Sequence, residues 1–204
     1  MTEDEALAWI SGHVDVSRGT LLRRFVDLIV DESARQNLIS SASLNHIWAR
    51  HIVDSAQLID FGQSNPGKWV DIGTGAGFPG IVVAILTDRP VVLIEPRRKR
   101  AEFLESAVLA LGLIERVTVV AARAESYRGI ADVISARAVA ALTDILAVGA
   151  HLSTAKTQWI LPKGPRALEE VAAARHSWHG VFHVEQSITD PQSLIITAKG
   201  VSRR

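Results

Sequence analysis

The stretch WVDIGTGAGFPG, residues 69–80, decides the fold of this chain. Its first four residues form a short apolar run interrupted only by Asp71, which is typical of a buried strand. Three glycines then alternate with other residues, at Gly73, Gly75 and Gly77. Glycine permits positive φ angles and a close approach of the backbone to a ligand. The pattern therefore predicts a strand that ends in a tight, ligand-binding turn before a helix.

Downstream of this stretch, short apolar runs alternate with amphipathic segments. We expect strands at 69–72, 91–95, 117–121, 132–135, 158–161, 181–184 and 194–197, and helices at about 80–87, 98–111, 141–150 and 166–177. Strands and helices that alternate at this spacing predict an α/β fold, with a seven-stranded, mostly parallel sheet covered on both faces. Because no helix-length segment separates the last two strands, they should form an antiparallel hairpin.

Upstream of the stretch, roughly the first 60 residues read as helical. Apolar residues recur there at helical spacing, as at Leu21, Leu22, Phe25, Leu28 and Ile29. The segment 62–67 contains two glycines and a proline, which is typical of a turn. We therefore predict a helical extension at 1–64 and a ligand-binding domain at 65–204, in a protein that we expect to be a monomer.

The composition excludes several classes of protein. The 204 residues include 48% hydrophobic and 22% charged residues, a globular balance. The absence of cysteine excludes disulfides, cysteine–zinc sites, iron–sulfur clusters and a cysteine nucleophile. Twenty-two basic and 22 acidic residues cancel, which argues against a generally basic protein. No histidine or carboxylate cluster has the spacing of metal ligands, so we expect no metal.

The N-terminal residues MTEDEALAWI lack the layout of a secretory signal. The longest uncharged run, 72–87, is too short to span a bilayer. We therefore expect a cytoplasmic protein with no membrane partner.

Two cofactors fit the glycine turn. Residues 75–80 match the G-x-G-x-x-G pattern of dinucleotide sites, which would make the protein an NAD-binding oxidoreductase. A pyrophosphate, however, prefers free N–H donors and no nearby anion, whereas Asp71 is close by and Pro79 lacks a donor. S-adenosylmethionine (SAM) carries a sulfonium and an ammonium, so the residues favour SAM. Glu95, 20 positions after Gly75, is placed to bind ribose hydroxyls. A glycine turn without a ligand remains open.

Several further segments are shared with one family. They are 36–39 (QNLI), 50–55 (RHIVDS), 71–80 (DIGTGAGFPG), 99–100 (KR) with 103–104 (FL), 135–138 (SARA) and 162–164 (PKG). In these the chain resembles the small-subunit ribosomal RNA (guanine-N7)-methyltransferase family RsmG, also called glucose-inhibited division protein B. The resemblance covers most of the chain. It implies a class I SAM-dependent methyltransferase, Rossmann-like, that acts on 16S rRNA of the small ribosomal subunit at N7 of guanine 527.

The resemblance also implies site residues. It places cofactor contacts at Gly73, Phe78, the pair Ala124-Glu125 and Arg137. The glycine turn and the strand ends add four candidates from the residues themselves, namely Asp71, Gly75, Gly77 and Glu95. The order Ser135-Ala136-Arg137 departs from the family's commoner Ser-Arg-Ala order.

The residues also narrow the methyl acceptor. Methylation of a pyrimidine at C5 normally uses a cysteine, which is absent. Methylation of an exocyclic amine usually relies on an Asn/Asp-Pro-Pro loop after the fourth strand, and 135–138 lacks it. Guanine N7 has a free lone pair and needs no general base. A methyltransferase with a small-molecule or protein acceptor, and a non-catalytic nucleotide-binding module, remain alternatives.

Arg137 is the candidate catalytic residue. At the end of the fourth strand it is placed to contact the guanine edge or the methionine carboxylate. The structural alternative is an ion pair with an acid such as Asp144. Arg50 and His51 are candidates for shaping the RNA or methionine pocket, and the alternative is an i,i+4 pair of Arg50 with Asp54 that packs the helix.

A run of four basic residues opens the helix expected at 98–111. It comprises Arg97, Arg98, Lys99 and Arg100. Positive charge is unfavourable at a helix N-terminus, which suggests contacts with RNA phosphates. Lys163 is a further RNA-contact candidate, and a solvated charged turn is the alternative for the run.

Overall fold

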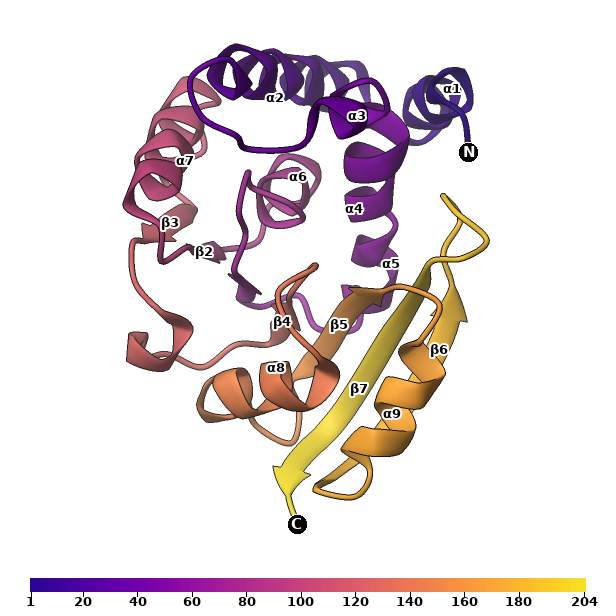
Figure 1. Cartoon of the computed structure of the whole chain (residues 1–204). Coiled ribbons are helices and arrows are strands. Elements are labelled where there is room, and N and C mark those ends of the chain that lie inside the picture. The colour runs from indigo at the N-terminus through magenta and orange to yellow at the C-terminus, as the bar shows by residue number, and fades with distance from the viewer.

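A computed structural model describes all residues, 1–204, and its centre is a seven-stranded sheet of order β3-β2-β1-β4-β5-β7-β6. The strands are β1 (Trp69–Ile72), β2 (Val91–Ile94), β3 (Val117–Val120), β4 (Val133–Ser135), β5 (Gln158–Lys163), β6 (Trp178–Gln186) and β7 (Leu194–Arg203). β7 runs antiparallel to both of its neighbours, and every other pairing is parallel. The predicted α/β fold and the terminal hairpin are confirmed (Figure 1).

The strand bounds differ from the prediction mainly in the hairpin. β6 and β7 have 9 and 10 residues, whereas the apolar runs predicted four residues in each. The difference arises because β6 is an edge strand on which exposed residues outnumber buried ones. Backbone pairing with β7 extends the strand beyond its apolar run, and an apolar pattern does not record that pairing.

Helices cover both faces of the sheet. α6 (Gly80–Leu86) and α7 (Arg98–Ala110) contribute to one hydrophobic cluster, which also contains Leu93 and Ile160 from the strands. α8 (Leu142–Gly149) and α9 (Ala167–Ala174) contribute to a second cluster with Ile94 and Trp159. The sheet is thus buried on both sides, as a parallel sheet requires. Short helical turns at η2 (Ala124–Ser126) and η3 (Ala150–Leu152) complete this part of the chain.

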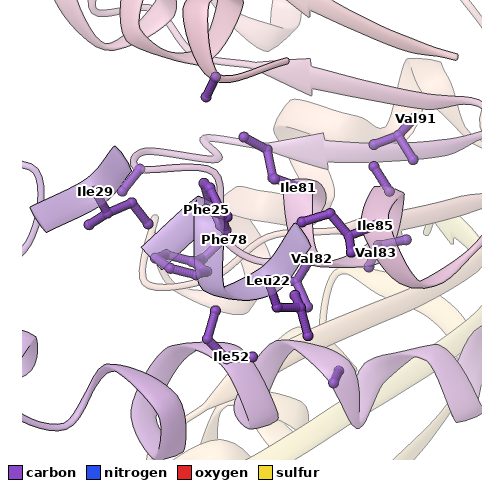
Figure 2. Packing of buried hydrophobic residues seen from close by; sticks show 14 of the residues in the cluster. Leu22, Phe25, Ile29, Ile52, Phe78, Ile81, Val82, Val83, Ile85 and Val91 are labelled. Carbon is purple, nitrogen blue, oxygen red and sulfur yellow. The ribbon is translucent and has the colours of Figure 1, made fainter. Parts of the chain in front are cut away.

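The first 62 residues are helical and lie on the α6 and α7 side of the sheet. They form α1 (Glu3–His13), α2 (Val16–Ser33), α3 (Ser41–Leu44), the π-helix η1 (Trp48–Val53), α4 (Asp54–Ala56) and α5 (Leu58–Gly62). Side chains of α2 at i, i+3, i+4 and i+7 spacing are buried, namely Leu22, Phe25, Val26 and Ile29. Phe25 and Ile29 pack beside Ile81 of α6 and Phe78 of the glycine turn (Figure 2). The extension and the sheet therefore share one continuous core.

None of the helices combines the length and the apolar character that a membrane crossing requires.

Candidate functional site

The glycine turn lies between β1 and α6, at the carboxyl end of the central strand. Gly73 and Gly75 have φ angles of 68° and 61° and are half-open. Their N–H groups donate to the Ile94 carbonyl and to Glu95, so it is their carbonyls that are available to a ligand. Gly77 has a φ of 100° but is buried, and a Cβ there would lie 2.7 Å from Ile81 and 3.0 Å from Phe25. Gly77 thus packs against the core. We expect that glycine is needed there because a larger side chain would collide with Ile81 and Phe25, and not because Gly77 contacts a ligand.

Asp71 is turned into the protein. Its Oδ1 accepts a hydrogen bond from the Ser135 hydroxyl at 2.7 Å, and its Oδ2 accepts one from the Gly80 N–H at 2.9 Å. The Ser135 hydroxyl in turn accepts the indole N–H of Trp69 at 2.7 Å. The carboxyl group is fully buried, and desolvation raises the pKa of Asp71 to about 6. The Asp71 carboxylate thus ties the turn to β4, and a contact of Asp71 with the cofactor stays a prediction.

Glu95 is also engaged by the backbone. Its Oε2 accepts from the Gly75 N–H at 3.0 Å and its Oε1 from the Arg97 N–H at 2.8 Å, and only 3% of the residue is exposed. Glu95 therefore fixes the glycine turn against the start of α7. On the same edge of the sheet, η2 follows β3 and presents a buried Ala124 and an exposed Glu125.

Arg137, just beyond β4, is held by the N-terminal extension. Its Nη1 donates to the backbone carbonyl of Arg50 at 3.0 Å and to Oδ2 of Asp54 at 3.2 Å. Both partners in this ion pair are largely buried. Arg137 is ion-paired with an acid, as the structural alternative expects, but the acid is Asp54 and not Asp144. The alternative of an Arg50–Asp54 pair is wrong, because Asp54 pairs with Arg137.

Phe78 forms the floor of this arrangement. Its ring stacks on the His51 ring at 4.8 Å, and the Arg137 guanidinium lies 5.1 Å from the ring centroid. Phe25 packs against it at 5.3 Å, and only 3% of Phe78 is exposed (Figure 2). A cation over an aromatic face is favourable, the more so when desolvated. The side chain of Phe78 thus orients Arg137 and His51, and little of it is open to a cofactor.

The protonation of His51 follows from its neighbours. A guanidinium only donates, so the contact of 2.8 Å between Arg137 Nη2 and His51 Nδ1 makes Nδ1 the acceptor. The ring proton is then on Nε2, which is buried without a partner. Burial, together with repulsion from Arg137 and Arg50, lowers the pKa of His51 to about 3. His51 is therefore neutral at physiological pH.

This neutral histidine predicts a pH-dependent loss of stability. A folded-state pKa of about 3 against 6.5 means that the unfolded chain binds the proton more readily between these values. Stability that is present above pH 6.5 is therefore lost as the pH falls toward 3. Between pH 7 and pH 5, the free energy of unfolding of the wild type should fall by roughly 2 kcal/mol more than that of His51→Gln. Urea denaturation of both proteins at the two pH values measures this, and parallel losses would contradict it.

The basic candidates separate into two groups. Arg97, Arg98 and Lys99 are exposed at the start of α7, where the structure records a helix without a side-chain cap. Arg100 is half-buried and donates to the Asn37 carbonyl at 3.3 Å.

Lys163 differs from the exposed cations. Its Nζ donates to the Ala140 carbonyl at 2.7 Å and lies 2.8 Å from Oε2 of Glu170, with 10% of its side chain exposed. Lys163 is therefore paired within the protein and keeps one of its three ammonium hydrogens for a ligand, so its contact with RNA stays a prediction. Glu170 was not predicted as a site residue, because a glutamate in the first turn of a helix is common and carries no functional signal of its own.

These features place a glycine turn, a held arginine and two strand-end acids at one edge of a doubly wound sheet. A family model for GidB, rRNA small subunit methyltransferase G, matches residues 18–193. The chain belongs to this family. The resemblance noted in the sequence is thereby confirmed.

Full-length relatives carry the same description. The chain is 48% identical over 205 residues to a ribosomal RNA small subunit methyltransferase G of Novosphingobium aromaticivorans, covering 98% of this chain and 89% of the relative. It is 47% identical over 209 residues to the protein of the same name in Rhizorhabdus wittichii, covering 100% and 95%.

Solved structures support the fold. A methyltransferase from Geobacter sulfurreducens superposes with a TM-score of 0.61 at 13% identity, covering 94% of this chain and 93% of that one. A ribosomal protein L11 methylase from Lactobacillus delbrueckii subsp. bulgaricus gives a TM-score of 0.57 at 19% identity, covering 74% and 77%. The fold is that of a class I methyltransferase.

Proposed function

We propose that this protein transfers a methyl group from SAM to N7 of a guanine in 16S rRNA, and that the guanine is number 527. The observation that carries the proposal is the Arg137 guanidinium, which is held beside the glycine turn by the Asp54 carboxylate, the His51 ring and the Phe78 face. The family supports rRNA as the substrate class.

The residues present fit SAM. Both hydrogens of Arg137 Nη1 and one of Nη2 are used within the protein. The Nε–H and the second Nη2 hydrogen remain, and together they form the edge of a guanidinium that binds a carboxylate with two parallel bonds. We assign this edge to the methionine carboxylate, with the carbonyls of the half-open Gly73 and Gly75 as further contacts. The chemistry that SAM supplies when bound is an electrophilic methyl group on a sulfonium.

The acceptor chemistry agrees with this assignment of Arg137. An arginine that reads guanine usually bonds to both O6 and N7. That contact would occupy the N7 lone pair, which must be free to attack the methyl group. Arg137 therefore acts on the cofactor side, and the chain contributes chiefly by alignment, which can supply about 7–11 kcal/mol of the barrier.

The division at 64/65 is proposed on functional grounds. Residues 65–204 supply the glycine turn and Arg137, whereas 1–64 supply Asp54 and His51, which orient Arg137. Because the proposed substrate is part of the small ribosomal subunit, we also propose that the protein is cytoplasmic.

The proposal is tested with small ribosomal subunits from a strain that lacks this protein. The purified protein and SAM should restore one 7-methylguanine, mapped by chain cleavage at the modified base. Calorimetry should show binding of SAM and none of NADH. Three results would contradict the proposal: methylation of a different base, binding of NADH instead of SAM, or SAM binding without turnover on subunits. The third result would point to another methyl acceptor or to a non-catalytic module.

Because the cations at the start of α7 are exposed, we predict that the affinity for 16S rRNA depends on salt concentration. If Arg98 and Lys99 each contact one RNA phosphate, replacing both with glutamine should lower the slope of log affinity against log salt by about 1.5–2. Filter binding of 16S rRNA across a salt series measures the slope. Arg175→Gln, an exposed residue that caps α9 over the opposite face of the sheet, is the matched control. An unchanged slope in the double variant would leave α7 without a role in RNA binding.

A further inference from the structure

An open pocket of about 340 Å³ adjoins Arg137 at the carboxyl ends of β4 and β5. Its lining includes Asp54, Arg137, Pro162, Lys163 and Glu170. The volume is within the range of small-molecule sites. In an open α/β sheet, ligands bind beyond the carboxyl ends of the strands, so the position of this pocket suits the methyl acceptor.

The two carboxylates of the pocket differ in whether an oxygen is free to accept a further hydrogen bond. Asp54 is satisfied within the protein, since Oδ1 accepts from Gln57 at 3.0 Å and Thr189 at 3.2 Å while Oδ2 accepts from Arg137. Glu170 has one oxygen engaged, because Oε2 accepts from the Leu142 N–H at 2.7 Å and from Lys163. Oε1 of Glu170 accepts no hydrogen bond from the protein, and the side chain is 25% exposed.

Lys163 completes a complementary pair with this free oxygen. Its ammonium has three hydrogens, and the Ala140 carbonyl and Glu170 Oε2 accept two of them. One N–H donor therefore remains next to one free carboxylate oxygen. The pair is held in place by backbone contacts from the segment that follows β4, so it is ordered without a ligand.

Guanine carries the matching groups on its Watson–Crick edge. The O6 acceptor there adjoins two donors, N1–H and the N2 amine, and this edge leaves N7 free. Enzymes that modify a base outside the helical stack commonly read its Watson–Crick edge by hydrogen bonds. We infer that Glu170 Oε1 accepts from the N1–H and N2–H groups of the target guanine while Lys163 donates to O6. This inference rests on the proposed function.

The test compares guanine with inosine, which lacks the N2 amine. Small subunits are reconstituted with 16S rRNA that carries either base at the acceptor position, and kcat/KM is measured with wild type, Glu170→Gln and the control Glu169→Gln, an exposed neighbour outside this pocket. The amide oxygen of Glu170→Gln can still accept from the Leu142 N–H, which preserves the local fold. The affinity for SAM, by calorimetry, and the melting temperature are measured alongside.

The wild type should prefer guanine roughly tenfold or more. The kcat/KM of Glu170→Gln should fall roughly ten- to a hundredfold on guanine and by a smaller factor on inosine, which keeps the N1–H contact but lacks the N2 amine. SAM affinity should be unchanged, and Glu169→Gln should behave as wild type. An equal loss on both acceptors would indicate a purely structural role and overturn the inference while leaving the proposed function intact. A wild type without preference for guanine over inosine would also overturn it, whether or not the variant folds. Absence of 7-methylguanine with the wild type would overturn both.

Discussion

Arg137→Ala is expected to reduce kcat/KM for methylation about a hundredfold or more. The variant loses the only charged donor edge that we assign to the methionine carboxylate, and a bidentate charge-assisted contact is among the strongest polar interactions. The same change leaves the carboxylate of Asp54, 14% exposed, without its cation. Folding should survive, with a loss of about 1–3 kcal/mol. Methyl incorporation, calorimetric SAM binding and thermal unfolding measure the three effects.

Arg137→Lys separates charge from geometry. Lysine keeps a positive charge near Asp54 but lacks the planar fork, so we expect normal stability with most of the activity lost. Near-normal turnover in both variants would remove Arg137 from the mechanism. Loss of activity with unchanged SAM affinity would move its role from the cofactor to the RNA.

The architecture was predictable from sequence because the central strands β1, β2 and β4 are buried on both faces and are therefore short apolar runs. β1 falls on the predicted residues, and α7 begins where predicted, at Arg98. The alternation of strands and helices then leaves few topologies, and the missing helix before β7 fixes the antiparallel hairpin.

The direction of the acidic side chains was not predictable. An acid at the end of a strand in an α/β fold is read as a ligand contact, yet the same position serves equally well to hold the following loop by its N–H groups. Asp71 and Glu95 both do the latter. Only coordinates distinguish the two, because they depend on side-chain rotation within one backbone position.

The partners of Arg137 were also beyond sequence reasoning. Asp54 lies 83 positions away, and the local pattern offered an i,i+4 partner that the structure does not use. A π-helical stretch at Trp48–Val53 changes which side chains of this segment face the sheet. Spacing rules that assume a regular α-helix therefore fail here, and they fail at the residues that orient the catalytic candidate.

Asp71→Ala is expected to destabilise the protein by roughly 2–4 kcal/mol and to weaken SAM binding at least tenfold. The buried Gly80 N–H loses its acceptor and the Ser135 hydroxyl loses its partner. The turn from Gly73 to Gly80 is then no longer tied to β4. Urea denaturation and calorimetry measure the two effects, and Ser153→Ala, a half-buried serine bonded only to its own turn, is the control. Wild-type SAM affinity in Asp71→Ala would show that the turn is held by other contacts.

Asp71→Asn isolates the charge of this residue. The folded-state pKa of about 6 lies above the ordinary value of 3.8, so the folded chain binds the proton more readily between these values. Stability from the protonated form is present below pH 3.8 and is lost as the pH rises through 6, whereas asparagine does not titrate. The free energy of unfolding of the wild type should thus fall by roughly 2 kcal/mol relative to that of Asp71→Asn between pH 4 and pH 7. The difference between the two urea curves is the proper measure, because His51 shifts wild-type stability in the opposite direction over the same range. A constant difference would mean that the Asp71 carboxyl titrates alike in the folded and unfolded chains, and that the network with Ser135 and Gly80 compensates its burial completely.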